Sequence, residues 1–257
     1  MKRCIDFSRY SSIKIGPICD VEVIKGIDPG YEELFLVGGA NNLLLSPTPP
    51  PLAILGKNFD YIRIQEGELI IGAATPTGKV ISFCKRHDIA GFEFLAKLPG
   101  TIGGAVRMNA GVKEYEIKNV LCWVRTYKGK ILAKDLGLAY RKSGIDSIVY
   151  EAGFTLQRGY NEKLRRQLLS LRSNQPKEPS AGSVFKNPTG EYAGRLIEAV
   201  GLKGKRVGNM AFSPVHANFL VNLGGGRYEE AMALIKEAKE KVLNRYGIEL
   251  QEEIIVL

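Results

Sequence analysis

The sequence predicts an α+β protein with a strand-rich N-terminal part and an α+β C-terminal part. Short strand-like runs separated by glycine and proline extend to Gln157, and apolar residues at helical spacing appear from Tyr160 onward. The boundary between the two parts is expected near residues 159–172. At 257 residues, 45% apolar and 25% charged, the chain can bury a core without disulfides or metals.

The N-terminal part is expected to form short strands at residues 21–24, 34–37, 52–55, 61–65, 69–73, 121–126 and 148–157. The proline-rich stretch at 46–51 cannot lie inside a helix or a central strand, so a loop is expected there. Thr75 or Thr77 can cap a helix that ends near Gly91. Residues 99–111 are too rich in glycine for a regular element, yet too small and apolar for a solvent loop.

The C-terminal part carries three helical stripes. Their apolar positions are Leu164, Leu168 and Leu171, then Ala193, Leu196, Ile197 and Val200, then Ala231, Leu234, Ile235, Ala238 and Val242. The first is ended by residues 173–176, the second by Gly201 and the third by Gly247. Strands are expected at 217–222 and at 248–257.

Charge and composition narrow the class of function. The net charge of +9 favours anionic partners, namely nucleic acid, an acidic membrane or phosphorylated small molecules. Residues 236–241 mix both signs of charge and no aromatic–basic interleaving appears, which argues against nucleic acid. No apolar run approaches the roughly 20 residues of a membrane span, and no signal peptide is recognised, so a cytoplasmic protein is expected.

Cysteine and histidine usage argues against a metal centre. The four cysteines, Cys4, Cys19, Cys84 and Cys122, are scattered without a CxxC pair and are expected to be buried thiols in a reducing compartment. Only two histidines are present, His87 and His216, and His216 is better explained as a structural residue than as a base. We therefore expect no metal site.

Two glycine-rich segments are candidate cofactor sites. The fingerprints of Rossmann and P-loop sites are absent. The Gly38–Asn42 turn follows a strand and can aim backbone N–H groups at a pyrophosphate, although a plain turn explains it too. Pro99–Ala105, continued by Asn109–Gly111, could lie against a flat cofactor, although close packing of two elements is the alternative. Together the two segments favour a dinucleotide cofactor.

Three polar clusters are less specific. Ala181–Pro188 combines a hydroxyl, an ammonium and an amide beside a glycine turn and could bind a phosphorylated sugar, or be a polar loop. Tyr140–Ser143, taken alone, has the composition of a solvated turn. Glu252 and Glu253 interrupt an apolar strand, so one carboxylate could face inward, where a functional role would explain the cost of burial.

Taken in order, these segments resemble the UDP-N-acetylenolpyruvoylglucosamine reductase (MurB) family. The resemblance covers nearly the whole chain, and the absence of a long C-terminal insertion is similar to the subgroup without the extra substrate-covering loop. It runs through residues 37–46, 99–111, 140–143, 180–188, 201–208, 216–222 and 247–254.

The resemblance implies a fold and an activity. The fold would be the FAD-binding fold of the vanillyl-alcohol-oxidase/PCMH type, with subdomains at 1–50 and 51–165, an α+β substrate-binding domain at 166–247 and a C-terminal strand at 248–257 returning to the FAD half. The activity would be reduction of UDP-N-acetylglucosamine enolpyruvate with NADPH in peptidoglycan precursor synthesis, without nucleic-acid or membrane partners. Two alternatives remain: another FAD-dependent oxidoreductase of this fold, and a non-enzymatic nucleotide-binding protein.

The resemblance also implies the roles of particular residues. Arg141 would clamp the substrate carboxylate, and Ser183 would protonate a carbanionic carbon. Glu253, rather than Glu252, would donate a proton to the same carboxylate. Substrate contacts are expected at Tyr140, Arg172, Lys186 and Asn187. Cofactor contacts are expected at Val37, Gly38, Gly39, Ala40, Asn41, Asn42, Leu43, Pro99, Gly100, Thr101, Gly103, Gly104, Asn109 and Ala110.

Overall fold

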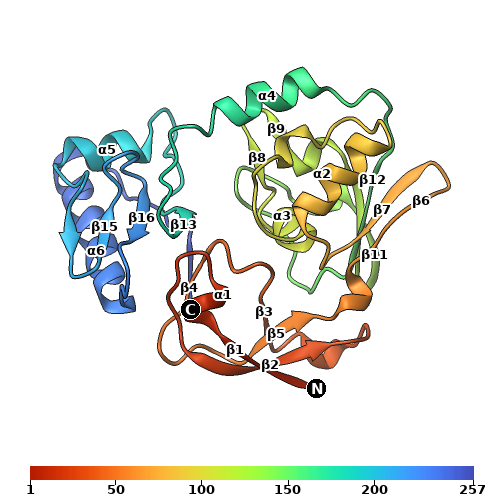
Figure 1. Cartoon of the computed structure of the whole chain (residues 1–257), viewed down its shortest axis with the longest axis horizontal. Helices are drawn as coiled ribbons and strands as arrows, with labels where there is room; N and C mark the ends of the chain where they lie inside the picture. The colour runs from red at the N-terminus through yellow and green to blue at the C-terminus, as the bar shows by residue number, and fades with distance from the viewer. The chain divides into compact units, whose positions relative to one another are not determined.

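The computed structural model describes all of residues 1–257 (Figure 1). Contacts between residues divide the chain into two compact units. The first unit comprises Met1–Arg3, Val21–Gly39 and Pro51–Ser173, and the second comprises Cys4–Asp20, Ala40–Pro50 and Asn174–Leu257. Each unit has its own hydrophobic core.

The first unit is built on a five-stranded antiparallel sheet. In spatial order its strands are β11 (Gly129–Leu132), β10 (Leu121–Thr126), β12 (Glu151–Thr155), β7 (Glu68–Gly72) and β6 (Ile62–Gln65). Alternate side chains such as Leu69, Ile71 and Phe154 are buried on one face. Helices α2 (Thr77–Arg86) and α3 (Ile102–Arg107) supply apolar side chains to the same core (Figure 1).

Shorter elements lead into the first glycine-rich turn. Strands β2 (Ile18–Ile24) and β3 (Phe35–Leu36) each pair in parallel with β5 (Leu52–Leu55). The Val37 amide then donates to the Ala53 carbonyl at 2.7 Å, so β5 orders the chain up to the turn. The remaining elements of this unit are η1 (Pro29–Tyr31), η2 (Lys57–Phe59), η3 (Glu93–Leu95), β8 (Gly111–Val112), β9 (Tyr115–Glu116), η4 (Ile117–Asn119), η5 (Ala133–Asp135) and α4 (Glu162–Ser170).

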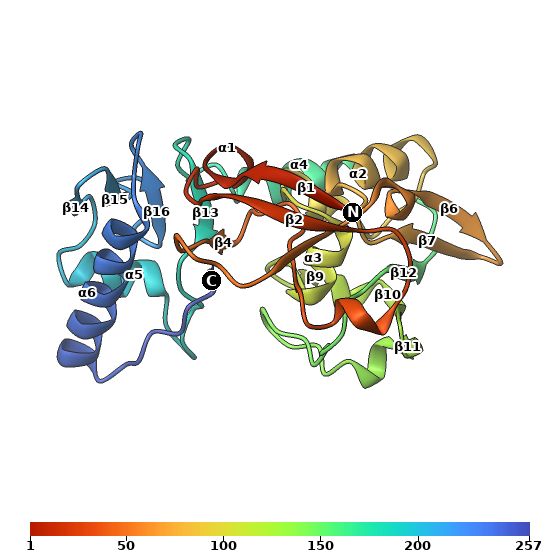
Figure 2. The same ribbon diagram turned by 90° about the horizontal axis from the view of Figure 1, so that it is seen from below.

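The second unit contains a four-stranded antiparallel sheet covered by two helices. The strand order is β13 (Ser180–Ser183), β16 (Phe219–Asn222), β15 (Met210–Phe212) and β14 (Arg206–Val207). Helices α5 (Ala193–Ala199) and α6 (Tyr228–Tyr246) lie on one side of this sheet (Figure 2). Gly247, at φ 67°, ends α6 as predicted, because glycine adopts the left-handed conformation without a Cβ clash.

The second unit also holds the C-terminus. Ile255–Val256 forms β17, which pairs in parallel with β4 (Leu43–Leu44), directly after the first glycine-rich turn. The short α1 (Phe7–Tyr10) follows β1 (Lys2–Asp6). The domain limits expected from the resemblance stay a prediction.

One expectation is wrong for a physical reason that bears on the site. Residues 99–111 were expected to contain no regular element, yet Ile102–Arg107 is a helix. The Thr101 hydroxyl accepts from the Gly104 amide at 3.5 Å, and a Cβ at Gly103 would lie 3.0 Å from the Ala73 Cβ. Helix α3 needs small residues because it packs closely against the chain at Ala73. Glycine lowers the intrinsic helix propensity of this segment, but the tertiary contacts outweigh that loss.

Two helix boundaries differ from expectation. Neither Thr75 nor Thr77 caps α2, because Pro76 occupies the N-cap position and the Thr77 hydroxyl donates to the Leu98 carbonyl. The helix also ends at Arg86 rather than near residue 91.

Two strands are shorter than expected, and the cysteines differ in burial. The strand expected at 148–157 spans only Glu151–Thr155. Of residues 248–257 only Ile255–Val256 is a regular strand.

All four thiols are free, but Cys84 alone is buried, and burial raises its pKa to about 12. The expectation of buried thiols is therefore wrong for the other three, because Cys4 is exposed and two are half-buried.

Candidate functional site

The two glycine-rich segments meet inside the first unit. A Cβ built on Gly38 would lie 2.8 Å from the Thr101 hydroxyl oxygen, so the Gly38 backbone lies closer to the Thr101 side chain than a residue with a side chain would allow. The Gly103 amide donates to the Ala73 carbonyl at 2.9 Å, and Ile102 N donates to Thr75 O at 2.9 Å. The expected cofactor residues Val37–Gly39 and Pro99–Gly104 are thus brought together.

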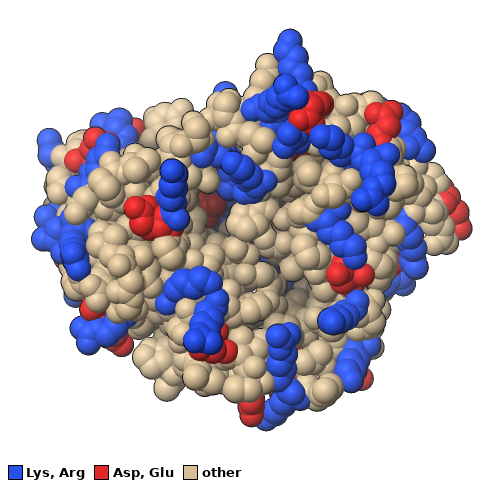
Figure 3. Space-filling view, viewed as in Figure 1, with Lys and Arg blue, Asp and Glu red and all other residues tan.

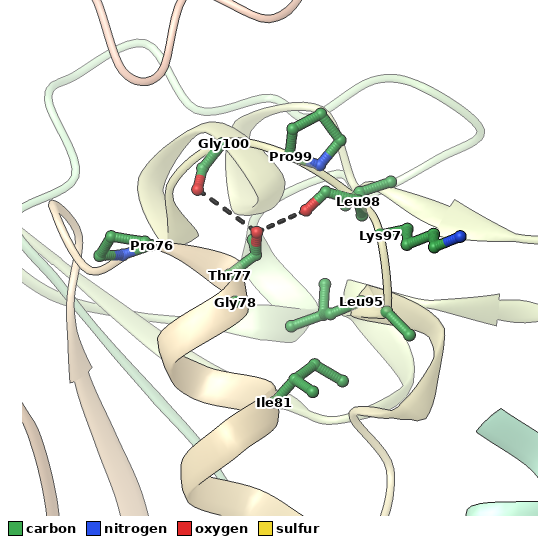
Figure 4. A pocket seen from close by; sticks show the side chains of 10 residues that line it. Pro76, Thr77, Gly78, Ile81, Leu95, Lys97, Leu98, Pro99 and Gly100 are labelled. Carbon is green, nitrogen blue, oxygen red and sulfur yellow. Dashed lines mark hydrogen bonds between the residues drawn. The ribbon is translucent and has the colours of Figure 1, made fainter. Parts of the chain in front are cut away.

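The first turns of α2 and the chain that precedes α3 line a shallow apolar depression of about 420 Å³ (Figure 4). Pro99 and Gly100 form part of its wall, opposite the first turns of α2. The Thr77 hydroxyl lies between the carbonyls of Leu98 and Gly100 and bonds to both. These two hydrogen bonds attach the start of the 99–104 segment to helix α2.

The last residues of the first turn belong to the second unit, where the C-terminal chain holds them. Ala40 has a positive φ of 49°, and its carbonyl accepts from the Ser12 amide at 3.1 Å. The Asn42 side chain donates to the Glu253 carbonyl at 2.9 Å, and the Ile255 amide donates to the Asn42 carbonyl at 2.9 Å. Ala40–Leu43 is therefore fastened by residues 253–255.

The C-terminal chain also lies beside Ser183. The Val184 carbonyl accepts from the Glu253 amide at 2.7 Å, and Phe185 and Glu252 form an antiparallel bridge. Ser183 itself pairs with Phe219 on β16. Two of the three expected catalytic residues, 70 positions apart in sequence, thus lie on neighbouring backbones of one unit.

The neighbouring carboxylates Glu252 and Glu253 have different surroundings. Glu252 forms an ion pair with Lys239 of α6 at 3.0 Å. Glu253 follows in a bend of the chain, where its amide donates to the Val184 carbonyl and its carbonyl accepts from the Asn42 side chain. The α6 contact gives Glu252 a structural role.

The Tyr140–Ser143 segment is a tight turn rather than a loose surface loop. Ala139 and Lys142 exchange both backbone hydrogen bonds, at 3.0 and 3.1 Å. Arg141 adopts a φ of 51°, an uncommon value for a residue with a side chain. Its guanidinium donates to the Gly111 carbonyl at 3.0 Å and lies 4.9 Å from the Tyr140 ring centre.

A second arginine lies near Arg141. Burial and the like charge of Arg141 both lower the pKa of Arg172, burial being the larger cause. Two guanidiniums that repel each other electrostatically favour an anionic ligand, since a negative charge offsets their repulsion. The expected substrate residues Tyr140, Arg141 and Arg172 are therefore grouped in the first unit.

Three other expected site residues have protein partners. Asn187 accepts from the Ala193 amide at the start of α5 at 3.1 Å, and the Lys186 amide donates to the Gln251 carbonyl at 2.9 Å. Asn109 is fully buried and has a φ of 40°. Its side-chain amide donates to Glu116 and to the Ala139 carbonyl and accepts from the Lys118 amide.

Asn218 supports the chain beside Ser183, and no sequence motif indicates it. It is buried, and its side chain donates to the Phe185 carbonyl at 2.7 Å and accepts from the Phe185 amide at 3.0 Å. The amide therefore holds the chain after Ser183 as a paired strand would. His216 Nδ1 accepts from the Asn218 amide at 3.2 Å, which agrees with the structural role expected for His216. The polar residue directly before an apolar strand was the available signal.

Charge is distributed in keeping with an anionic ligand. On the face shown in Figure 3, lysine and arginine side chains appear on both units with acidic side chains among them. No group of three or more His, Cys, Asp or Glu side chains is arranged to hold a metal ion. None of the helices combines the length and the apolar composition that crossing a membrane requires.

The residues present fit a flavin dinucleotide. Gly38 and Gly39 are half-buried and Gly104 is exposed, so backbone of both segments remains accessible to a ligand. Backbone N–H groups in such turns are donors for a pyrophosphate. Within the first unit, the cradle would be formed by residues 37–39 and 99–104.

Comparisons with known proteins point to one family. Residues 175–257 match the model of the C-terminal domain of UDP-N-acetylenolpyruvoylglucosamine reductase. A reductase of this name from Helicobacter pylori is 46% identical, over 100% of this chain and 99% of its own. Another from Campylobacter jejuni is 42% identical, over 98% of this chain and 99% of its own.

A solved structure shares the fold. The crystal structure of UDP-N-acetylenolpyruvylglucosamine reductase (MurB) from Thermus caldophilus superposes with a TM-score of 0.87 at 28% identity, over 100% of this chain and 98% of that one. The predicted α+β fold of this flavoenzyme family is thereby confirmed. Full-length identity at this level, together with the shared fold, shows that the chain belongs to the UDP-N-acetylenolpyruvoylglucosamine reductase family.

Proposed function

We propose that the chain reduces UDP-N-acetylglucosamine enolpyruvate to UDP-N-acetylmuramate with NADPH and FAD, as a step in peptidoglycan precursor synthesis. Membership of the reductase family supports this reaction. The observation that carries it furthest is the approach of Gly38 to Thr101, which brings the two glycine-rich segments together. Because the nucleotide sugar and NADPH are cytoplasmic metabolites, we place the reaction in the cytoplasm.

The glycine-rich segments would bind the cofactor. Residues 37–39 and 99–104 of the first unit would hold the FAD pyrophosphate through backbone N–H groups, without a charged side chain. FAD, when bound and reduced by NADPH, supplies the hydride that adds to C3 of the enolpyruvyl group. The remaining chemistry, stabilising negative charge and delivering one proton to C2, falls to side chains of the protein.

Arg141 would stabilise the negative charge that spreads from C2 into the carboxylate. A guanidinium can bind a carboxylate through two parallel hydrogen bonds. The turn between Ala139 and Lys142 and the bond to the Gly111 carbonyl fix its position before substrate arrives. Arg172, which lies near Arg141, would bind a further anionic group of the same substrate, and Tyr140 would pack against it.

Ser183 would protonate C2, and Glu253 in its protonated form would donate to the substrate carboxylate. Their backbones lie side by side, which supports a joint role. A serine hydroxyl is a weak acid, so it is suited to protonating a strongly basic carbon. Lys186 and Asn187, directly after the Ser183 segment, would contact the sugar nucleotide.

Separate measurement of the two half-reactions tests the function. The purified protein should be yellow, NADPH should bleach the flavin under anaerobic conditions, and the enolpyruvyl ether should then restore its absorbance. A control without the ether should remain reduced. Reoxidation by O₂ but not by the ether would identify a different flavin oxidoreductase, and a colourless protein that does not bind FAD would indicate a nucleotide-binding protein without this activity.

A further inference from the structure

The Asn109 side chain is hydrogen-bonded to the turn that carries Arg141. It is fully buried, and three of the four hydrogen-bonding positions of its side-chain amide have protein partners. Nδ2 donates to Glu116 at 3.1 Å and to the Ala139 carbonyl at 3.0 Å, and Oδ1 accepts from the Lys118 amide at 2.9 Å. The side chain is thus directed into the protein.

The bond to Ala139 reaches the base of the turn. Ala139 and Lys142 close the turn, and Arg141 occupies its second corner with a φ of 51°. Glycine or asparagine is favoured there, so an arginine holds this conformation only when surrounding contacts impose it.

Three contacts tie the turn to the chain that continues from helix α3. Besides the Asn109–Ala139 bond, the Arg141 guanidinium donates to the Gly111 carbonyl at 3.0 Å and the Ser143 hydroxyl donates to the Arg107 carbonyl at 2.7 Å. Of these three, the contact from Asn109 is made by a fully buried side chain, where a hydrogen bond is strongest and a lost partner costs most.

We propose that Asn109 is a positioning residue for Arg141, and that it acts through the Ala139 carbonyl rather than by contacting the cofactor. This inference rests on the proposed function of Arg141. A guanidinium displaced by about 1 Å would meet the substrate carboxylate in poor geometry, which can cost about 10²-fold in rate.

The test compares Asn109→Gly with Asn119→Ala. Glycine tolerates the positive φ of residue 109, so the variant removes the side chain without straining the backbone. Asn119 is the matched control, because its side chain accepts from the Glu116 amide in the same cluster but does not reach the turn. Asn109→Gly should slow reoxidation of the flavin by the enolpyruvyl ether about 10- to 100-fold. Flavin reduction by NADPH, and both half-reactions of Asn119→Ala, should stay within about twofold of the parent.

Two readouts separate positioning from cofactor binding or general destabilisation. In the flavin-free protein, amide hydrogen exchange of residues 139–143 should be faster in Asn109→Gly than in Asn119→Ala, while FAD titration should give an unchanged affinity. Added to Arg141→Ala, Asn109→Gly should cause no further loss of reoxidation rate, because residues that act as a unit are not additive.

Weakened FAD binding with normal reoxidation, or losses that multiply in the double variant, would overturn the proposal. If Asn109→Gly does not fold, Ser143→Ala tests the same turn by removing its exposed bond to the Arg107 carbonyl. This variant should also slow reoxidation, and unchanged reoxidation would reject the proposal. Normal reoxidation in Arg141→Ala would reject the proposed function of Arg141. If Asn109→Gly is reoxidised at the normal rate and Arg141→Ala is not, the positioning role of Asn109 is rejected and the proposed function of Arg141 stands.

Discussion

The glycine-rich pair of the first unit and the Ser183–Glu253 pair of the second are built in opposite ways. Gly38 approaches Thr101 because side chains are missing, and even one added carbon would collide. Ser183 and Glu253 lie on backbones that are paired through the Val184 carbonyl, so their side chains can change without breaking that pairing. Mutations in the first region should therefore reduce the amount of bound flavin. Mutations in the second region should leave the flavin bound and slow its reoxidation by the substrate.

The largest expected effect is on the chemistry of the second region. Ser183→Ala should leave flavin content and reduction by NADPH unchanged and slow reoxidation by the enolpyruvyl ether about 10²–10⁴-fold, the usual cost of removing a positioned acid. Anaerobic stopped-flow absorbance of each half-reaction measures this. Ser180→Ala, at the other end of β13, is the control. Equal loss of both halves would instead give Ser183 a structural role.

The first region should show the reverse pattern. Gly38→Val should purify with less than about a tenth of the native flavin, because its branched side chain cannot fit beside Thr101. Gly26→Val is the matched control, since no atom lies within 4 Å of a Cβ built there. Flavin absorbance per protein is the measurement. A Gly38→Val protein with full flavin would remove this turn from the cofactor site.

Adjacent glutamates sharpen the comparison within the second region. Glu253→Gln should lower reoxidation by the enolpyruvyl ether about 10- to 100-fold, because an amide is a far weaker proton donor than a carboxylic acid. Glu252→Gln should keep full activity and lose at most about 0.5 kcal/mol of stability, the value of a partly exposed ion pair with Lys239. Half-reaction rates and urea denaturation distinguish the two, and the opposite ranking would make Glu252 the catalytic residue.

The smallest expected effect is a pH dependence of stability in the second region. Burial lowers the pKa of His216 from its ordinary 6.5. Below about pH 6.5 the unfolded chain binds a proton that the folded chain resists, so the free energy of unfolding should fall as the pH drops. His216→Gln should flatten that slope, whereas His87→Gln, at an exposed site, should not. Urea midpoints at several pH values between about 5 and 8 provide the measurement, and equal slopes for both variants would contradict the prediction.

The sequence by itself determined the elements that depend on local periodicity. Helices α4, α5 and α6 and strands β5 and β10 follow from apolar spacing and from stop signals such as Gly247, because periodicity and capping are properties of neighbouring residues. The order of weak motifs also identified the family correctly, since a full-length series of matches is specific even when each motif is not.

Only the tertiary structure decided which residues meet. Helix α3 forms despite its glycines, because its close packing against Ala73 requires small residues. The ion pair between Glu252 and Lys239 distinguishes two adjacent carboxylates that the sequence leaves equivalent. Asn109 and Asn218 likewise act on backbone groups about 30 residues away. Such contacts join residues that are distant along the chain, so no local pattern encodes them, and they appear only when the cores of the two units close around buried polar groups.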